Sequence, residues 1–279
     1  MDPALDERSG AGAGQDDPKP GVRAAGVEQQ AVRLAADPQI VVLEGLHCVK
    51  HAIRFDADVV LLVASDRPAA LDLAASLAPD IVGRLEADLV AADASTLARV
   101  VGGRTRADLI GFARRPSRGG VQRGGAARRE TPTVLLENPR HLGNLGAVVR
   151  VAAGFGASAV LSTGSVDPWH PAVVRASAGL HFATSVERVA AGDPVPAAAG
   201  PLLAFDPSGE DLREIVIPDS AVLAFGSERH GLSATLRGRA DRMVAIPMLE
   251  RVSSYNLATA VAVGLYHWSG GATGRSRVP

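Results

Sequence analysis

The sequence predicts an α/β protein built from two domains, and three observations lead to this prediction. The chain has 279 residues, which is long enough for two domains. Short apolar runs of strand length alternate with longer segments whose apolar residues recur at helical spacing. An arginine-rich segment that cannot form a core separates the two alternating regions. Several strand runs, such as DVVLLVA at 58–64, are apolar throughout, which is typical of buried parallel strands.

Composition restricts the possible function classes. Apolar residues make up 47% of the chain and aromatic residues 4%, so Ala, Val and Leu must form the core. The formal charge of -1 does not by itself indicate nucleic acid as a partner. Cys48 is the single cysteine, which excludes an internal disulfide and a multi-cysteine metal site, and we expect no metal. Without an apolar leader or a run of about 20 apolar residues, we expect a soluble cytoplasmic protein without membrane contact.

The first region, 37–115, alternates strands and helices and is expected to form a small α/β domain. Residues 1–36 are expected to be a disordered tail, with a helix forming near Val27 to Ala36. The segment LHCVKHAIRF places Leu46, Val49 and Ile53 on one helix face. The expected strands are 40–45, 58–64, 89–93 and 109–116, and the expected helices are 46–55, 68–77 and 94–102.

The segment 116–130 is expected to be a linker rich in arginine and glycine. Six arginines lie at or beside it, with no acidic residue before Glu130: Arg114, Arg115, Arg118, Arg123, Arg128 and Arg129. This composition fits a solvated tether and an electrostatic strap for phosphates equally well.

The second region, 131–270, is expected to form another α/β domain, followed by a tail at 271–279. Its last helix repeats apolar residues at spacing four, at Leu257, Val261 and Leu265. We expect function at the loops that follow the strands. The expected strands are 133–137, 158–162, 201–205, 221–227 and 243–248, and the expected helices are 144–156, 171–179 and 256–268.

The segment ENPRHLGNLGAVVR, at 137–150, joins an expected strand to an expected helix. It lacks the GxGxxG fingerprint and ribose-binding acid of dinucleotide folds and the lysine of a phosphate loop, which disfavours a dinucleotide-dependent oxidoreductase. Asn144 at the helix start would be a good N-cap. Arg150 lies on an otherwise apolar helix and must reach solvent, a carboxylate or an anionic ligand.

Two later loops also follow strands. FGSERHGLS, at 225–233, places Glu228 between Gly226 and Gly231, which permit close backbone approach. IPMLERVSSYNLATAV, at 246–261, leads through Ser254 and Asn256 into an apolar helix. Each loop alone is typical of an ordinary turn or helix cap.

Together, in this order, the motifs N-x-G-x-x-x-R, G-x-E-x-x-G and IPM followed by S-x-N resemble the SpoU (TrmH) family of the SPOUT superfamily. These proteins are RNA ribose 2'-O-methyltransferases. The resemblance covers Thr131 to about Trp268 and is highly specific. The preceding LEGLHCVKHAI and its domain also resemble the ribosomal-protein-like RNA-binding domain that many members carry, on fewer residues.

The resemblance implies a C-terminal SPOUT domain with a parallel sheet and a deep trefoil knot, S-adenosylmethionine as cofactor, and a homodimer with the site near the subunit interface. It places catalytic roles on Asn144, Arg150, Glu228, Ser254 and Asn256. It places the cofactor against Gly226, Ile246, Met248, Ser254, Tyr255 and Leu257. Tyr255 departs from the family, which usually has Leu there, so its ring could narrow the pocket or reach the RNA.

By this resemblance, Arg150 would clamp a phosphate and stabilise the developing alkoxide, because a guanidinium resists deprotonation. Asn144 would orient the ribose hydroxyl, and Glu228 would position Arg150 or the Asn144 loop. RNA contacts are expected from Arg150, Arg114, Arg115 and Arg118. The expected substrate is structured RNA, with 23S rRNA favoured over tRNA. A self-protection enzyme that modifies 23S rRNA against a thiopeptide antibiotic and a non-catalytic RNA-binding protein remain alternatives.

Overall fold

The protein is described from a computed structural model, which defines residues 20–103, 108–117, 130–190 and 200–271. Most of the expected linker, including Arg118, lies outside the described residues. The first 19 residues of the expected N-terminal tail and positions 272–279 of the expected C-terminal tail lie outside them as well.

The N-terminal region folds around a mixed sheet. Within the described residues this sheet has the order β1-β4-β2-β3, in which β4 runs antiparallel to β1 and β2, while β2 runs parallel to β3. The expected parallel environment of β2 is therefore wrong on one side, because β4 returns between β1 and β2. The elements are β1 (Ile40–Glu44), α2 (Leu46–Arg54), β2 (Val59–Ala64), α3 (Arg67–Leu77), α4 (Val82–Asp88), β3 (Leu89–Ala91), α5 (Ala94–Val100) and β4 (Leu109–Arg114).

The helix expected near Val27 to Ala36 is confirmed, and it begins earlier than expected, because residues Pro20–Ala36 form helix α1 within the expected tail. Ala31 is fully buried, and Val27 and Leu34 pack against the same cluster. Their spacing of three to four residues places them on one helix face, which covers the sheet beside α5. Burial of this face holds the helix in place, since a short helix gains most of its stability from packing.

The C-terminal region folds around a parallel sheet, as the sequence predicts. In the part of the chain that the structure describes, its order is β10-β8-β9-β5-β6-β7, and every pairing is parallel. The strands are β5 (Thr133–Leu136), β6 (Ala159–Ser162), β7 (Ser185–Arg188), β8 (Leu202–Asp211), β9 (Val222–Phe225) and β10 (Arg242–Ala245). The helices are α6 (Leu142–Phe155), α7 (Pro171–Ala176), α8 (Ala234–Arg239) and α9 (Leu257–Gly270), and β7 and α8 were not predicted.

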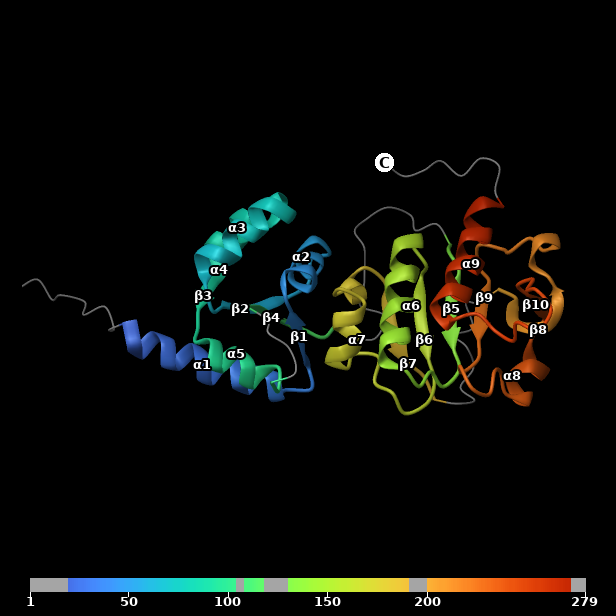
Figure 1. Ribbon diagram of the computed structural model, residues 1–279, viewed down its shortest axis with the longest axis horizontal. Coiled ribbons are helices and arrows are strands. Elements are labelled where there is room, and N and C mark those ends of the chain that lie inside the picture. The colour runs from blue at the N-terminus through green and yellow to red at the C-terminus, as the bar shows by residue number, and fades with distance from the viewer. Residues whose placement is uncertain (1–19, 104–107, 118–129, 191–199, 272–279) are drawn as a thin grey trace, which may run out of the picture.

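Strand alternation divides the C-terminal core into two layers. Val134, Leu136 and Val160 face the layer of α6, α7 and α9, where the predicted repeat Leu257, Val261 and Leu265 is buried. Leu135, Leu161 and other intervening residues face the opposite layer, where α8 packs. The helices α6 and α9 lie side by side over the sheet (Figure 1).

The two sheets are joined by a dense interface in which α7 packs against β1 (Figure 1). The guanidinium of Arg175 pairs with the buried carboxylate of Glu44 at 2.7 Å. Residue Gly179, at φ 76°, lies so close to the backbone of Cys48 that a Cβ atom there would overlap it. Arg175 therefore lies in the junction between the domains, where the N-terminal domain supplies its carboxylate partner.

Cys48 is a packing residue. Its thiol is buried and lies 3.8 Å from the carbonyl of Val174. Burial, and secondarily the nearby charge of Glu44, raise the pKa of Cys48 to about 12. The thiol is therefore protonated at neutral pH and is not a nucleophile.

Candidate active site

The three expected loops meet at one cavity of about 660 Å³ at the carboxyl ends of β8, β9 and β10. Parallel strands bring the loops that follow them to the same edge of the sheet, which explains why distant motifs converge. Of the expected catalytic and cofactor residues of the C-terminal domain, all except Arg150 line this cavity: Asn144, Gly226, Glu228, Ile246, Met248, Ser254, Tyr255, Asn256 and Leu257.

A continuous line of hydrogen bonds joins the three loops. The amide nitrogen of Asn144 donates to Glu228 Oε1 at 2.8 Å. The amide nitrogen of Asn256 donates to Asn144 Oδ1 at 3.1 Å. The oxygen of Asn256 in turn accepts from the backbone N–H of Ala258 at 2.9 Å, which caps α9. Each side chain therefore fixes the orientation of the next, so a substitution in one loop should alter the side-chain positions in the other two.

Glu228 is a carboxylate in this arrangement. Partial burial raises the pKa of Glu228. The hydrogen bonds from Asn144 and from the backbone N–H of Arg140 lower it by more, so the net pKa lies below its usual value. An ionised carboxylate accepts hydrogen bonds only, so the Asn144 side chain must turn its nitrogen toward Glu228. The Asn144 oxygen is left to accept from Asn256.

The expected role of Asn144 as a helix cap is wrong. Helix α6 begins at Leu142 with His141 as its N-cap, so Asn144 already lies in the first turn, and its side chain bonds other loops. Gly146 of the same motif is needed for packing. A Cβ atom there would overlap Ala176 and the carbonyl of Val173, so only glycine lets α6 and α7 approach so closely.

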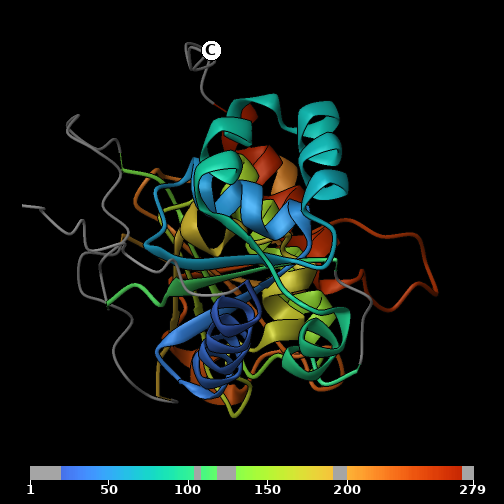
Figure 2. The same ribbon diagram turned by 90° about the vertical axis from the view of Figure 1, so that its left-hand side faces the viewer.

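The loop between β10 and α9 is held at both ends. Asn256 caps the helix, as expected, and the Tyr255 hydroxyl donates to the carbonyl of Pro247 at 3.0 Å. Between these points Leu249 is 84% exposed. Figure 2 shows this part of the chain as an orange-red loop that projects from the domain. The departure at Tyr255 therefore ties the third motif to the end of the preceding strand.

The second motif forms a tight reversal around Glu228. Ser227 and Gly231 pair across it through both backbone hydrogen bonds. A Cβ atom at Gly226 would overlap the backbone of Gly231 and Leu232. Gly231 adopts a positive φ of 62°, which favours glycine. Both glycines of the motif are therefore required by the backbone.

Among the lining side chains that sequence reasoning missed, four form a distinct group. The Phe205 and Phe225 rings stack at 4.4 Å between centroids and form an apolar wall. Asp206 and Arg237 lie beside this wall as an ion pair. Asp206 follows the buried strand run PLLAF, and a polar residue directly after a parallel strand is a signal that could have identified it.

Comparison with known proteins agrees with this arrangement. Residues 131–266 match the model of the SpoU rRNA Methylase family. The C-terminal domain belongs to the SpoU family. In structure, the chain resembles the SpoU methyltransferase AviRb of Streptomyces viridochromogenes, solved with AdoMet, at a TM-score of 0.67 and 21% identity. That match covers 86% of this chain and 96% of AviRb.

Two curated relatives each match a little less than half of this chain. The 23S rRNA (uridine(2479)-2'-O)-methyltransferase of Streptomyces viridochromogenes is 32% identical over 48% of this chain and 50% of its own length. The ribosomal RNA small subunit methyltransferase G 2 of Syntrophobacter fumaroxidans is 36% identical over 45% of this chain. The matched region spans half of the first relative and 25% of the second.

Arg150 lies apart from the cavity of its own SpoU domain. It is exposed on α6, six residues after Asn144. Six residues of α-helix rotate a side chain by about 240° and advance it by about 9 Å, so the two side chains lie on different faces. Within one chain, the structure therefore does not bring Arg150 to the other expected catalytic residues.

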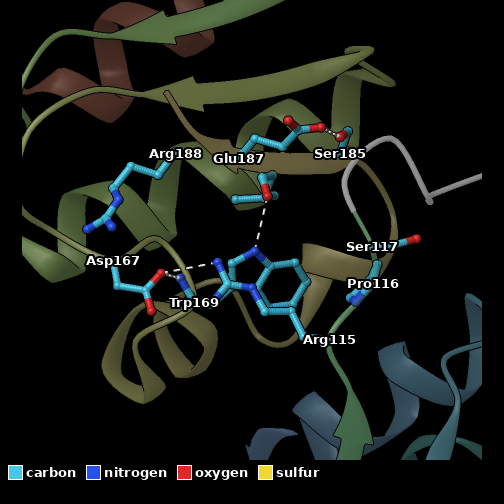
Figure 3. A pocket seen from close by; sticks show the side chains of 9 residues that line it. Arg115, Pro116, Ser117, Asp167, Trp169, Ser185, Glu187 and Arg188 are labelled. Carbon is cyan, nitrogen blue, oxygen red and sulfur yellow. Dashed lines mark hydrogen bonds and ion pairs between the residues drawn. The ribbon is translucent and has the colours of Figure 1, made fainter. Parts of the chain in front are cut away.

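The expected RNA-binding arginines at the end of β4 have partners within the chain. Arg114 pairs with Asp58 at 3.0 Å. Arg115 pairs with Asp167 at 3.3 Å and lies 5.3 Å above the Trp169 ring. Figure 3 shows this contact beside a small cavity of about 220 Å³ next to the edge strand β7. Arg115 thus fastens the end of β4 to the SpoU domain, whereas Arg114 pairs within the N-terminal domain.

Behind Trp169 lies a fully buried histidine, His181. Its Nε2 donates to the carbonyl of Pro168, and its Nδ1 accepts from the Ser177 hydroxyl, both at 2.8 Å. Burial lowers the pKa of His181 to about 4, so the ring is neutral at physiological pH.

Across the described ranges, no helix is both long and apolar enough to cross a bilayer. The same ranges contain no group of three or more His, Cys, Asp or Glu side chains arranged to hold a metal ion.

Proposed function

We propose that this chain methylates a ribose 2'-hydroxyl in RNA, using S-adenosylmethionine as methyl donor, and that the RNA is 23S rRNA. The hydrogen-bonded line from Glu228 through Asn144 to Asn256, in the lining of one cavity, carries this proposal. The SpoU family of the C-terminal domain supports the reaction. The name of the 23S rRNA 2'-O-methyltransferase relative supports the choice of RNA.

The cavity suits a nucleoside cofactor. Its volume of about 660 Å³ falls within the range of small-ligand sites, roughly 300 to 1,000 Å³. The stacked Phe205 and Phe225 rings offer an apolar wall, and Gly226 keeps the facing backbone close. S-adenosylmethionine would lie against Gly226, Ile246, Met248, Ser254, Tyr255 and Leu257. When bound, it supplies a methyl group activated by its sulfonium.

The remaining residues would place the acceptor. Asn144 lies in a bonded pair with Glu228 and would hold the ribose hydroxyl in a fixed orientation. Arg150 would clamp the neighbouring phosphate and stabilise the negative charge that develops on the 2'-oxygen. It does not act as a base, because a guanidinium stays protonated in proteins.

The position of Arg150 is best explained by a homodimer. On its own chain this side chain is exposed and turned away from the cavity. We infer that Arg150 reaches the cavity of a second copy, so that each site is completed across the subunit interface. A lone cation on an otherwise apolar helix has a clear purpose in such an assembly.

The other finer expectations are proposals of the same kind. The N-terminal domain would bind structured RNA, and Arg114, Arg115 and Arg118 would contact that RNA. The C-terminal segment would form a deep trefoil knot; α9 returns from the edge strand β10 to pack on α6, which supports such a path. We propose a cytoplasmic location, where its RNA substrate is made and assembled.

The direct test is methyl transfer from labelled S-adenosylmethionine to total RNA from a strain that lacks the gene. We expect label in 23S rRNA at one 2'-O-methyl position. The Arg150→Lys variant should keep cofactor affinity and lose most turnover, because lysine cannot form a two-pronged contact with phosphate. Label in tRNA alone would correct the substrate. RNA binding without any transfer would favour the non-catalytic alternative.

A further inference from the structure

Asp206 is a nearly buried carboxylate that lines the candidate active site. It follows Phe205 on β8, and Phe205 pairs with Phe225 across the neighbouring strand. Only 8% of the Asp206 side chain is exposed. The carboxylate therefore lies next to the two stacked rings, on the side of the cavity formed by β8 and β9.

The hydrogen bonds of Asp206 hold it in one orientation. Its Oδ1 accepts from the backbone N–H of Ser208 at 3.0 Å and from the Ser208 hydroxyl at 2.6 Å. Its Oδ2 pairs with Arg237 at 2.5 Å. Arg237 is itself anchored, because its Nε donates to the carbonyl of Leu232 at 3.2 Å. A carboxylate offers about four acceptor positions, so Oδ2 can still accept one further hydrogen bond on the cavity side.

The group is ionised, and its charge is balanced. Burial raises the pKa of Asp206, but the Ser208 hydrogen bonds and the charge of Arg237 outweigh this, so the net pKa lies below its usual value. Because Arg237 offsets the negative charge, a neutral hydroxyl is a suitable donor to this oxygen and a cation is not required. In dinucleotide-binding α/β sheets, an acidic residue accepts hydrogen bonds from a ribose hydroxyl. Asp206 lies within β8, directly after the last residue that pairs with β9.

We propose that Asp206 recognises the cofactor by accepting a hydrogen bond from a ribose hydroxyl of its adenosine moiety, with Ser208 and Arg237 as positioning residues. The inference rests on the proposed function, since it requires an adenosine-containing cofactor in this cavity. It assigns ribose selectivity to β8, separately from the three loop motifs. The adenine ring of the cofactor then lies along the apolar wall formed by Phe205 and Phe225.

Calorimetric binding to the full-length protein tests the proposal. The probes are S-adenosylmethionine, adenosine, 2'-deoxyadenosine and 3'-deoxyadenosine. The wild-type protein should bind adenosine about tenfold or more tightly than at least one deoxyadenosine, because a hydrogen bond to a charged group is lost. Asp206→Asn should weaken S-adenosylmethionine binding by a similar factor and remove the discrimination between adenosine and that deoxyadenosine.

Glu210→Gln provides the matched control. Glu210 lies on the same strand and pairs with Arg242, but it is exposed and outside the cavity lining. This variant should bind all four probes as the wild type does. Ser208→Ala should cause a smaller loss than Asp206→Asn, since it removes one of the two donors to Oδ1. Equal binding of S-adenosylmethionine by Asp206→Asn and wild type would overturn the proposal.

The outcomes separate this proposal from the proposed function. If the wild type binds neither S-adenosylmethionine nor adenosine, the proposed function itself fails. If it binds both, but binds the deoxyadenosines equally well, the ribose role of Asp206 fails and the function stands. Should Asp206→Asn not fold, the wild-type comparison of adenosine with the deoxyadenosines decides alone.

Discussion

Asn144 donates a hydrogen bond of 2.8 Å to Glu228, a residue 84 positions later in the chain. The contact links the helix that follows β5 to the loop that follows β9, and so joins two motifs that lie far apart in the sequence. It requires a donor facing an ionised acceptor. Replacement of either side chain by a group of the same size but the wrong hydrogen-bonding character is therefore an informative change.

Asn144→Asp should test this requirement through pH. It places a second carboxylate against Glu228, and two such groups in contact resist joint ionisation, so one pKa is raised. We expect a lower melting temperature than wild type at pH 8. The deficit should shrink toward pH 5, where a shared proton restores a hydrogen bond. A deficit that is constant between pH 8 and pH 5 would contradict the assignment.

Two substitutions of Asn256 separate its cap from its contact with Asn144. Serine also caps helices but is too short to reach Asn144, so Asn256→Ser should keep stability within about 0.5 kcal/mol. Its methyl transfer should fall at least tenfold. Asn256→Ala loses the cap as well and should cost about 1 kcal/mol in urea unfolding. Full activity in Asn256→Ser would show that the bond to Asn144 is dispensable.

Gly146→Ala and Gly143→Ala form a matched pair on α6. At Gly146 the added methyl overlaps Ala176 and Val173, and overpacking should destabilise the protein by about 1 to 3 kcal/mol. At Gly143 nothing lies within 4 Å of the added methyl, and alanine favours the helix, so stability should be unchanged or rise by up to about 1 kcal/mol. Similar unfolding free energies for both variants would argue against the close α6–α7 contact.

Arg175→Ala should weaken the junction between the two domains. It removes the guanidinium from the buried Glu44 carboxylate, and loss of a hydrogen bond to a charged group should lower the unfolding free energy by about 2 kcal/mol. The control, Arg213→Ala, breaks a surface pair with Asp211 and should leave the unfolding transition unchanged. Equal losses of unfolding free energy in the two variants would mean that the Arg175–Glu44 pair stabilises the protein no more than an exposed pair does.

The buried His181 should make stability depend on pH. Its folded-state pKa of about 4 lies below the usual 6.5, so the unfolded chain binds the proton more tightly. Its contribution is complete above pH 6.5 and is lost as the pH falls toward 4, by about 3 kcal/mol in total. His181→Gln should show a shallower loss of unfolding free energy over this window. Parallel pH profiles for the two proteins would exclude this histidine as the source.

The sequence predicts the strands and the motif loops well, because their cues are local. Apolar runs such as 133–136 and 222–225 are continuous, and the repeat Leu257, Val261 and Leu265 has a single helical period. The carboxyl ends of parallel strands must lie at one edge, so convergence of the loops could be expected.

Other features were not predictable because they depend on partners distant in the chain. Arg175 looks like a solvated cation until folding brings Glu44 to it. The position of Asp206 after an apolar run is a local signal, but its pairing with Arg237 and its place beside the stacked rings depend on distant residues. A helix near Val27 to Ala36 could be expected from the sequence, but the burial of Ala31 could not, because it depends on contact with α5 and the N-terminal sheet.

The strand order also defines a span across the molecule. The N-terminal domain attaches beside α7 and β7, whereas the cavity opens at β9, β8 and β10. Adjacent strands lie about 4.8 Å apart, which separates the two regions by roughly 15 to 25 Å along the sheet. Because α7 packs against β1 and Arg175 pairs with Glu44, the junction holds the two domains at this separation. Under the proposed function, an RNA that contacts both domains must span this distance, which a single nucleotide is too short to do.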